Sequence, residues 1–335
     1  MAGRTALRLP DLLPSGRLTV HANEIVSPSS PHRVSDAGLA RRLYGANHDD
    51  GPLALLVAVL STRADQDWAL YAAHRERLTD VVAQSSRMAG ATTAPGEIRR
   101  LCVLGAGHCN DLDLERLAES FGEIHLVDID GPALARAVAR QPASVRARLH
   151  RHGDVDLSGL SRRRLARWKG IVPGAGEIET AANAALDAIL TKVGGSFDVV
   201  ASTCVLTQMA FALREALGER HPALQAVRFA LMRTHLSTLV GLTSPGGVAI
   251  FASDVVSSTT YPLAEPSPGR TTTDLLRDVV SAGAAYFAAN PELVAGLLAE
   301  VAPPELLAPW LWTGPLARTY LVYAMRLHLP IDAES

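Results

Sequence analysis

One stretch of the sequence, residues 101–114 (LCVLGAGHCNDLDL), limits what the chain can fold into more than any other. Its first four residues are apolar and run without alternation into Gly105, Ala106 and Gly107, which is typical of a buried parallel strand that ends in a tight turn. Glycine at 105 and 107 lets the backbone turn sharply and lets a ligand lie against bare main chain. Because a helical pattern of leucines follows, the stretch predicts a strand, a glycine turn and a helix.

A second strand is expected over 123–127 (EIHLV), and it ends in the carboxylates of Asp128 and Asp130. A glycine turn followed about twenty residues later by an acidic strand end is the arrangement that holds nucleoside-containing cofactors. The spacing therefore indicates such a site where the first two strands end.

The alternation of strand and helix from residue 97 onward predicts a parallel sheet with helices on both faces. The strands are expected at 99–104, 123–127, 145–150, 197–201 and 248–251. The main helices between them are expected at 133–140, 177–192 and 211–239, the last interrupted near His221. The end of the chain, 310–312 and 319–328, is expected to form two antiparallel strands.

The first part of the chain predicts a separate unit. Residues 1–34 are rich in proline, serine and polar residues, and amphipathic helical patterns follow, the last of them over 65–82. A linker that contains proline, 91–96, comes next. We therefore expect an N-terminal arm and helical cap over 1–95 and an α/β domain over 96–335.

Composition excludes several classes of partner. The formal net charge of −2 gives no field that would attract nucleic acid or an anionic membrane surface. Cys102, Cys109 and Cys204 form neither a paired metal spacing nor a disulfide framework, which suits a reducing cytoplasm and predicts no metal site. The longest early apolar run, 53–60, is far shorter than the ~20 residues that span a bilayer. A cytoplasmic protein is expected.

Two later motifs follow the glycine turn and the acidic strand end along the sequence. An Asp-led apolar run, FDVVASTC, occupies 197–204, and Pro245-Gly246-Gly247 precedes the fifth strand. With the glycine turn and the acidic strand end, this order resembles that of the class I S-adenosylmethionine-dependent methyltransferases over residues 96–328. The resemblance implies a seven-stranded, mostly parallel Rossmann-like sheet with an antiparallel C-terminal hairpin, and S-adenosylmethionine as the cofactor.

The resemblance also assigns the adenosine end of the cofactor. It places Asp128 on the ribose hydroxyls, with Asp130 as the second candidate and Ile129 between them. A carboxylate suits this position because it accepts hydrogen bonds from both hydroxyls. Asp154 matches the family position that meets the adenine amine, with the backbone of Val155 beside it.

The methionine end is expected over residues 105–107, where the sequence departs from the family. Val103 replaces the usual acid, and Cys109 stands at the third glycine position. Asn110 and Asp111 are therefore candidates for the cofactor's ammonium and carboxylate groups. Alternatively, Asp111 caps the helix that follows, since an acid near a helix N-terminus is favourable by ~0.3–1 kcal/mol.

Residues after the fourth strand face both cofactor and acceptor in the family. Here they include Thr203 and Cys204 as cofactor contacts, and Ser202 and Gln208, which with Asn110 are the catalytic candidates. Alternatively, Ser202 and Thr203 have only a structural role and start the next helix.

The family's N-terminal helices often fold over the cofactor. By that analogy of position, Tyr44, Asn47 and His48 are candidates for a substrate pocket because they lie at a helix end and turn. A helical buttress without ligand contact is the alternative.

Three activities follow from these motifs. The first is methyl transfer to a small-molecule acceptor, which needs mostly alignment and no metal. The second is attack on the aminocarboxypropyl chain of S-adenosylmethionine with release of methylthioadenosine, as in the azetidine-2-carboxylate synthases. The third is a nicotinamide-dependent oxidoreductase, whose third motif glycine would fall at Asn110. Apolar faces at 53–60 and 229–239 are compatible with a homodimer or with the core.

Overall fold

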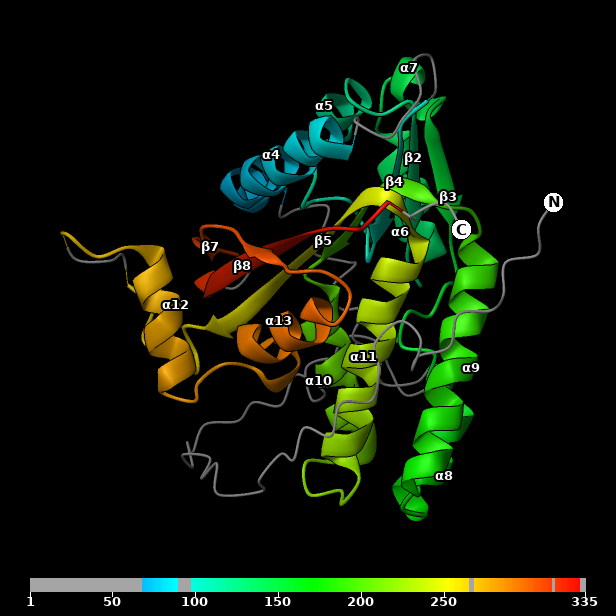
Figure 1. Cartoon of the computed structure of the whole chain (residues 1–335), viewed down its shortest axis with the longest axis vertical. Helices are drawn as coiled ribbons and strands as arrows, with labels where there is room; N and C mark the ends of the chain where they lie inside the picture. The colour runs from blue at the N-terminus through cyan, green and yellow to red at the C-terminus, as the bar shows by residue number, and fades with distance from the viewer. Residues whose placement is uncertain (1–67, 90–97, 265–267, 315–316, 332–335) are drawn as a thin grey trace.

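The computed structural model describes residues 68–89, 98–264, 268–314 and 317–331 (Figure 1). Their strands form one eight-stranded sheet in the order β3-β2-β1-β4-β5-β8-β6, and β7 also pairs with β8. The strands are β1 Arg100–Leu104, β2 Glu123–Val127, β3 Leu149–His152, β4 Phe197–Thr203, β5 Thr243–Ser257, β6 Glu305–Leu306, β7 Trp310–Thr313 and β8 Thr319–His328. Strands β1 to β5 are parallel, and β8 is antiparallel to its neighbours.

Helices connect the strands and cover both faces of the sheet (Figure 1). They are η1 Trp68–Tyr71, α4 Ala72–Ala89, α5 Leu114–Ala118, α6 Gly131–Ala139, α7 Ala143–Arg146, α8 Arg162–Gly170, α9 Ala175–Val193, α10 Val205–Leu217, α11 Leu224–Leu242, α12 Thr272–Ser281, η2 Phe287–Ala289 and α13 Pro291–Ala299. No helix among these described residues is both long and apolar enough to cross a membrane.

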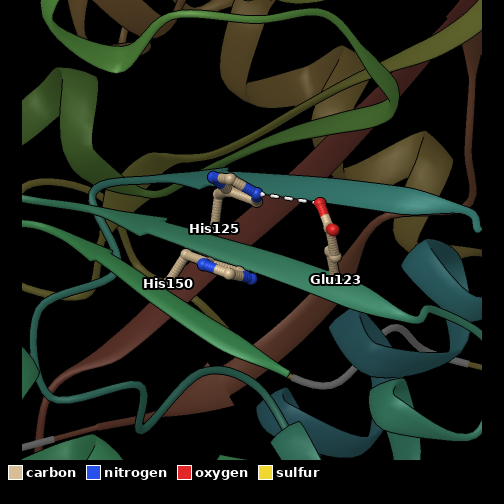
Figure 2. Close-up of side chains that lie close together, drawn as sticks. All are labelled: Glu123, His125 and His150. Atoms are coloured by element: carbon tan, nitrogen blue, oxygen red, sulfur yellow. Dashed lines mark ion pairs between the residues drawn. The ribbon is translucent and has the colours of Figure 1, made fainter. Parts of the chain in front are cut away.

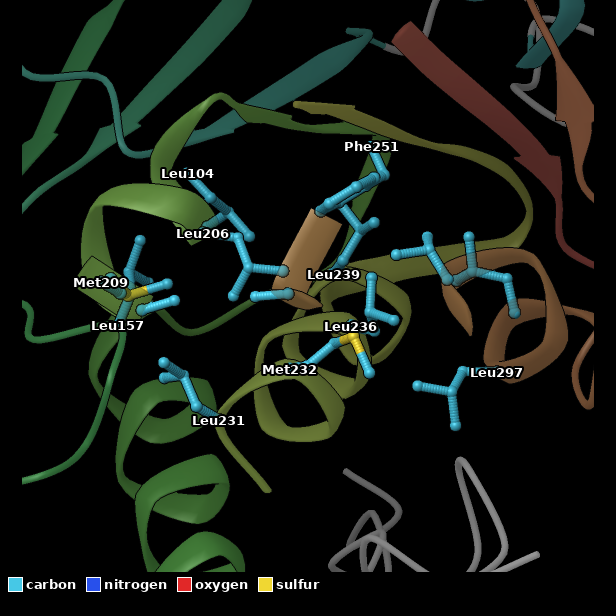
Figure 3. Close-up of a cluster of buried hydrophobic side chains, with 14 of the residues drawn as sticks. Leu104, Leu157, Leu206, Met209, Leu231, Met232, Leu236, Leu239, Phe251 and Leu297 are labelled. Atoms are coloured by element: carbon cyan, nitrogen blue, oxygen red, sulfur yellow. The ribbon is translucent and has the colours of Figure 1, made fainter. Parts of the chain in front are cut away.

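The alternation of side chains along β1 divides the core into two clusters. Cys102 and Leu104 point into the larger one, which includes apolar residues of α9, α10, α11 and α13 (Figure 3). Leu101 and Val103 point into the smaller one, with residues of α4, α5 and α6. Because both faces of β1 are buried, the continuous apolar run that predicted this strand is explained by its central place in the sheet.

The expected fold is confirmed, with three differences in detail. The strand order and the antiparallel C-terminal strands agree with the expected Rossmann-like sheet, but the two-residue strand β6 brings the count to eight instead of seven. Strand β5 begins earlier and ends later than the predicted 248–251, so that it includes the Pro-Gly-Gly turn.

The third strand was predicted over 145–150, and this position is wrong. Residues 143–146 form the short helix α7, which begins after Pro142, and the strand starts only at Leu149. Val145 is buried as a helix residue. A single buried valine therefore gave a strand pattern where the fixed φ of the proline favours a helix start.

The described part of the N-terminal unit consists of η1 and α4, and α4 packs against β4 and β5. The division of the chain at residues 95 and 96 stays a prediction.

Candidate functional site

The strand order reverses between β1 and β4, because the chain builds outward from β1 to β3 and then returns to place β4 on the other side. In open α/β sheets, ligands bind beyond the carboxyl ends of the strands at such a switch point. Here β1 is followed by the glycine turn at 105–107, and β4 ends at Thr203 and is followed by Cys204. The switch point therefore coincides with the predicted cofactor residues.

The glycine turn is fixed by packing and by backbone conformation. Gly105 has a φ of +78°, and a Cβ there would lie 2.4 Å from the Cβ of Val205 at the start of α10. Gly107 has a φ of +47°, but a Cβ there would meet only Asp128 Oδ2, at 3.8 Å. The first glycine is thus required for packing against α10, and the second leaves bare backbone next to Asp128.

Asp128 joins this turn to the end of β2. Its Oδ2 accepts a hydrogen bond from the Gly107 N–H at 2.8 Å, and its Oδ1 accepts one from the Asp130 N–H at 2.8 Å. Burial raises the pKa of this carboxyl, and the backbone N–H donors oppose the rise. Since each carboxylate oxygen has more than one acceptor site, Asp128 can still accept further hydrogen bonds from a ligand.

Asp130 is a helix cap. Its Oδ1 accepts a hydrogen bond from the Ala133 N–H at 2.8 Å at the start of α6, where Pro132 lies in the first turn. This carboxylate therefore stabilises the helix and leaves Asp128 as the better placed of the two acids. Ile129, between them, is half-buried.

Asp154 and Val155 lie beside the same edge. The Val155 N–H donates to the Asp128 carbonyl at 3.1 Å, and a Cβ on Gly153 would lie 2.9 Å from the Gly131 Cα. Asp154 is exposed in a left-handed conformation, and its carbonyl accepts a hydrogen bond from Lys192 Nζ. The close approach of the two loops places Asp154 next to the end of β2.

Asp111 does not cap the helix that follows, so that alternative is wrong. The N-cap of α5 is Asp113, whose Oδ1 accepts the Arg116 N–H at 3.1 Å. Asp111 keeps 24% of its side chain exposed, and burial raises its pKa to about 7. A carboxyl group with such a pKa directly after the glycine turn can take up or release a proton near neutral pH.

Helix α4 lies over this segment. Arg75 donates to the Asn110 carbonyl at 3.1 Å, and Thr79 Oγ1 accepts the Asp113 N–H at 2.9 Å. His74 Nε2 lies 3.7 Å from Asp111 Oδ1. The N-terminal unit therefore covers the residues that follow the glycine turn.

His74 is held in one tautomer. Its Nδ1 accepts a hydrogen bond from Trp310 Nε1 at 3.0 Å, and an indole N–H can only donate. Burial and the charge of Arg75 lower the pKa of His74 to about 4, so the ring is neutral at pH 7 with its proton on Nε2, facing Asp111.

His74 belongs to an aromatic cluster that joins α4 to the C-terminal strands. The cluster consists of Tyr71, His74, Trp310, Trp312 and Tyr320. Trp312 is at its centre, stacked on His74 with ring centroids 4.6 Å apart and on Tyr320 at 5.2 Å. Tyr71 contacts the same ring at 4.7 Å.

Asp254, on β5, is a second acid at this edge that the sequence analysis missed. Thr207 Oγ1 donates to its Oδ1 at 2.5 Å, and burial raises its pKa to about 7. Its charge raises the pKa of Asp111 and of Tyr320, so it lies near both the glycine turn and the aromatic cluster. The signal in the sequence was a lone acid within an apolar run, FASDVVS, just beyond the predicted end of the fifth strand.

The residues predicted to follow the fourth strand separate into two groups, and Ser202 and Thr203 end β4 itself instead of starting α10. Thr203 Oγ1 donates to the Gly105 carbonyl at 3.4 Å. Cys204, in a left-handed conformation, is the N-cap residue of α10. Burial raises the pKa of its thiol, and the nearby charges of Asp254 and Asp111 raise it further. Ser202 is fully buried, and its hydroxyl lies 2.7 Å from His235 Nε2, so the structure places it in the core and not with the other candidates.

Gln208 and Asn110 complete the catalytic candidates. Gln208 is exposed, and its Nε2 donates to the Cys204 carbonyl at 3.1 Å. Asn110 is buried beneath α4. The predicted pocket residues Tyr44, Asn47 and His48 lie outside the described residues.

No protein-family model and no curated protein matches the chain. Several solved structures are similar to it. An O-methyltransferase family protein from Burkholderia thailandensis is 13% identical, with a TM-score of 0.31 over 78% of this chain and 60% of that one. An O-methyltransferase from Bacillus cereus in complex with SAH is 10% identical, with a TM-score of 0.36 over 87% and 96%. The [4+2]-cyclase SpnF is 15% identical, with a TM-score of 0.36 over 76% and 82%.

Proposed function

We propose that the protein is an S-adenosylmethionine-dependent transferase that binds its cofactor across the carboxyl edge of β1, β2 and β4. The observation that carries the proposal is Asp128, a carboxylate fixed by the N–H groups of Gly107 and Asp130 beside a glycine turn at the switch point. Its remaining acceptor sites suit the ribose hydroxyls, residues 105–107 suit the methionine end, and Asp154 with the Val155 backbone suits the adenine.

The bound cofactor supplies an electrophilic carbon next to a sulfonium. The chain's own residues orient the reactants, exclude water and accept the proton that the nucleophile releases. Asp111 and Asp254 are the groups we assign to proton uptake, since each has a pKa of about 7. Methyl transfer to a small-molecule acceptor is the leading reaction.

A second reaction is favoured by the position of Asp111. This acid follows the glycine turn, where the amino-acid end of the cofactor is expected, and it is not used as a helix cap. It can therefore deprotonate the cofactor's own ammonium group. The freed amine would form a C–N bond at the carbon attached to sulfur, the C–S bond would break, and methylthioadenosine would leave with the electron pair.

The third activity, hydride transfer with a nicotinamide cofactor, has less support. Asn110 stands where the third motif glycine is needed, and the strand beside β5 is the antiparallel β8.

One experiment separates the three activities. The purified protein is incubated with S-adenosylmethionine, with and without candidate amine and hydroxyl acceptors, and the nucleoside product is identified by mass spectrometry. S-adenosylhomocysteine that forms only with an acceptor supports methyl transfer. Methylthioadenosine without an acceptor supports the second reaction and removes the first. Calorimetric binding of NADH but not of S-adenosylmethionine would overturn both.

A further inference from the structure

Polar side chains also gather at the opposite end of β2, away from the cofactor edge. Glu123 and His125 lie on one face of β2, because they are two residues apart, and His150 of β3 is the register partner of His125. The two imidazole rings are stacked, with centroids 4.6 Å apart and planes 21° apart. Figure 2 shows the three side chains side by side, with Glu123 pointing toward the His125 ring.

The donor atoms are close to the spacing of a metal site. One ligand atom from each of the three residues lies within 4.8 Å of the other two, and His125 Nε2 is 3.5 Å from Glu123 Oε2. Ligand atoms in a tetrahedral zinc site, with metal bonds of about 2.0–2.1 Å, lie roughly 3.3–3.4 Å apart. Side-chain rotations that shorten the widest of these separations by about 1.4 Å would therefore bring the three atoms around one ion.

One tautomer of His125 leaves Nε2 available to an ion. Arg100 Nη2, which can only donate, and Glu123 Oε2, which can only accept, each lie 3.5 Å from this nitrogen, so the two contacts favour opposite tautomers. The other nitrogen, Nδ1, lies 2.9 Å from His152 Nε2, and in the tautomer that binds an ion through Nε2 it donates to that nitrogen. A metal-bound histidine usually donates its second ring N–H in this way, which fixes the orientation of the ring.

The site is open on one side. His150 is exposed, Glu123 keeps 34% of its side chain exposed, and His125 keeps 11%. Three protein ligands with one accessible position are the coordination that Zn²⁺ accepts when water or another group completes the tetrahedron. Imidazole and carboxylate ligands without cysteine also suit other divalent first-row ions.

The Arg100 guanidinium competes with a metal ion for Glu123. Its Nε donates to Glu123 Oε2 at 2.9 Å, and its Nη1 donates to the Ser196 carbonyl at 2.9 Å. These two bonds hold the guanidinium beside Glu123, and Oε2 keeps a second lone pair for an ion, as does the other carboxylate oxygen. The positive charge nearby lowers the affinity for a cation without occupying the ligand atoms of His150.

From this geometry we propose that Glu123, His125 and His150 bind a divalent first-row transition-metal ion, of which Zn²⁺ is the probe of choice, and that His152 positions His125. The ion would join β2 to β3, which is the edge strand of the sheet. Along the strand, Glu123 is five positions from Asp128, about 16 Å, and His125 is three positions from it, about 10 Å, so the site is distinct from the cofactor edge.

The test uses the full-length, untagged protein after treatment with EDTA and dialysis. Titration with ZnCl₂ is followed by calorimetry, and thermal unfolding is measured with and without the ion. We expect about one equivalent of zinc to bind and to raise the unfolding temperature. His150→Ala is expected to weaken binding at least about tenfold, because removing even an outer partner of a ligand costs 10–100-fold. Glu123→Gln is expected to act in the same direction.

His328→Ala is the matched control, because His328 is also exposed and near the end of a strand. It should bind zinc as the wild type does. His150→Gln, which keeps a polar side chain on β3, replaces His150→Ala if that variant unfolds. Absence of zinc binding in the wild type, or equal affinity in the His150 and His328 variants, would overturn the proposal.

Discussion

The two ends of β2 hold their acidic residues in different ways. At the carboxyl end, both oxygens of Asp128 accept hydrogen bonds from backbone N–H groups. At the amino end, Glu123 is bonded to the side chain of Arg100 and lies 3.5 Å from His125. The fold itself therefore orients Asp128, whereas the neighbouring side chains orient Glu123.

The acids at the two ends of β2 also differ in the direction in which their pKa values are shifted. Burial raises the pKa values of Asp128, Asp111 and Asp254, so the carboxyl edge holds acids whose charged form is disfavoured. At the other end, the hydrogen bond from Arg100 lowers the pKa of Glu123. Acids whose pKa values are raised by burial and which lie at one edge of a sheet are typical of functional sites. Substitutions at the glycine turn, at Asp254 and at Asp128 would test this difference between the two ends of β2.

The largest effect is expected at the glycine turn. Gly105→Ala would place a Cβ 2.4 Å from that of Val205 in a left-handed backbone conformation. Left-handed strain and overpacking together predict a loss of about 2–5 kcal/mol in the free energy of unfolding, measured in urea. Gly176→Ala is the control, since a Cβ there meets nothing within 4 Å. Equal stability of the two variants would show that the turn is not fixed by α10.

The second effect is a pH dependence of stability that comes from Asp254. Its pKa is raised from 3.8 to about 7, so the folded protein binds more protons than the unfolded chain between these values. The free energy of unfolding should therefore fall as the pH rises from about 4 to about 7. Asp254→Asn removes this dependence and should stabilise the protein above pH 7, by at most about 4 kcal/mol at 1.36 kcal/mol per pKa unit.

Asp274→Asn should change the free energy of unfolding in the opposite direction. Hydrogen bonds from Thr271 lower the pKa of Asp274 to about 2, so its contribution is present above pH 4 and is lost as the pH falls toward 2. Urea unfolding across pH 3–8 should show both variants diverging from the wild type as the pH rises, Asp254→Asn toward higher stability up to about pH 7 and Asp274→Asn toward lower stability up to about pH 4. A wild-type slope that Asp254→Asn leaves unchanged would mean that Asp254 is solvated.

The sequence predicted those elements whose signal is local. The strand before Gly105 contains a continuous apolar run, Leu101 to Leu104, because it is buried on both faces, and the strand before Asp128 (EIHLV) is buried over its last four residues. Strand β3 (LHRH) has no such run, since it is the edge strand, and its predicted position was wrong. The role of Asp111 was open between a cofactor contact and a helix cap, because the leucine pattern starts at Leu112, whereas the helix begins at Leu114 after its cap Asp113.

Other parts of the site depend on contacts that no local pattern encodes. His74 and Trp310 are 236 positions apart and meet only when α4 packs on the sheet. His125 and His150 meet only through the register of β2 and β3. Cysteine spacing, the basis for expecting no metal site, carries no information on such a pair. The chemistry of Asp254 was hidden because the end of β5 could not be located from the apolar run alone.

The smallest effect separates the two ends of β2 directly. Asp128→Ala should weaken S-adenosylmethionine binding by about 1–3 kcal/mol, because the ribose hydroxyls and two backbone N–H groups lose their acceptor. The same variant should leave zinc binding unchanged, and Glu123→Gln should show the reverse pattern. Asp130→Ala is the local control: it removes the cap of α6, which costs about 0.5–2 kcal/mol of stability, but not the ribose contact. If Asp130→Ala weakened cofactor binding as much as Asp128→Ala, the acid would act by ordering the loop, and the backbone-held carboxylate would lose its assigned role.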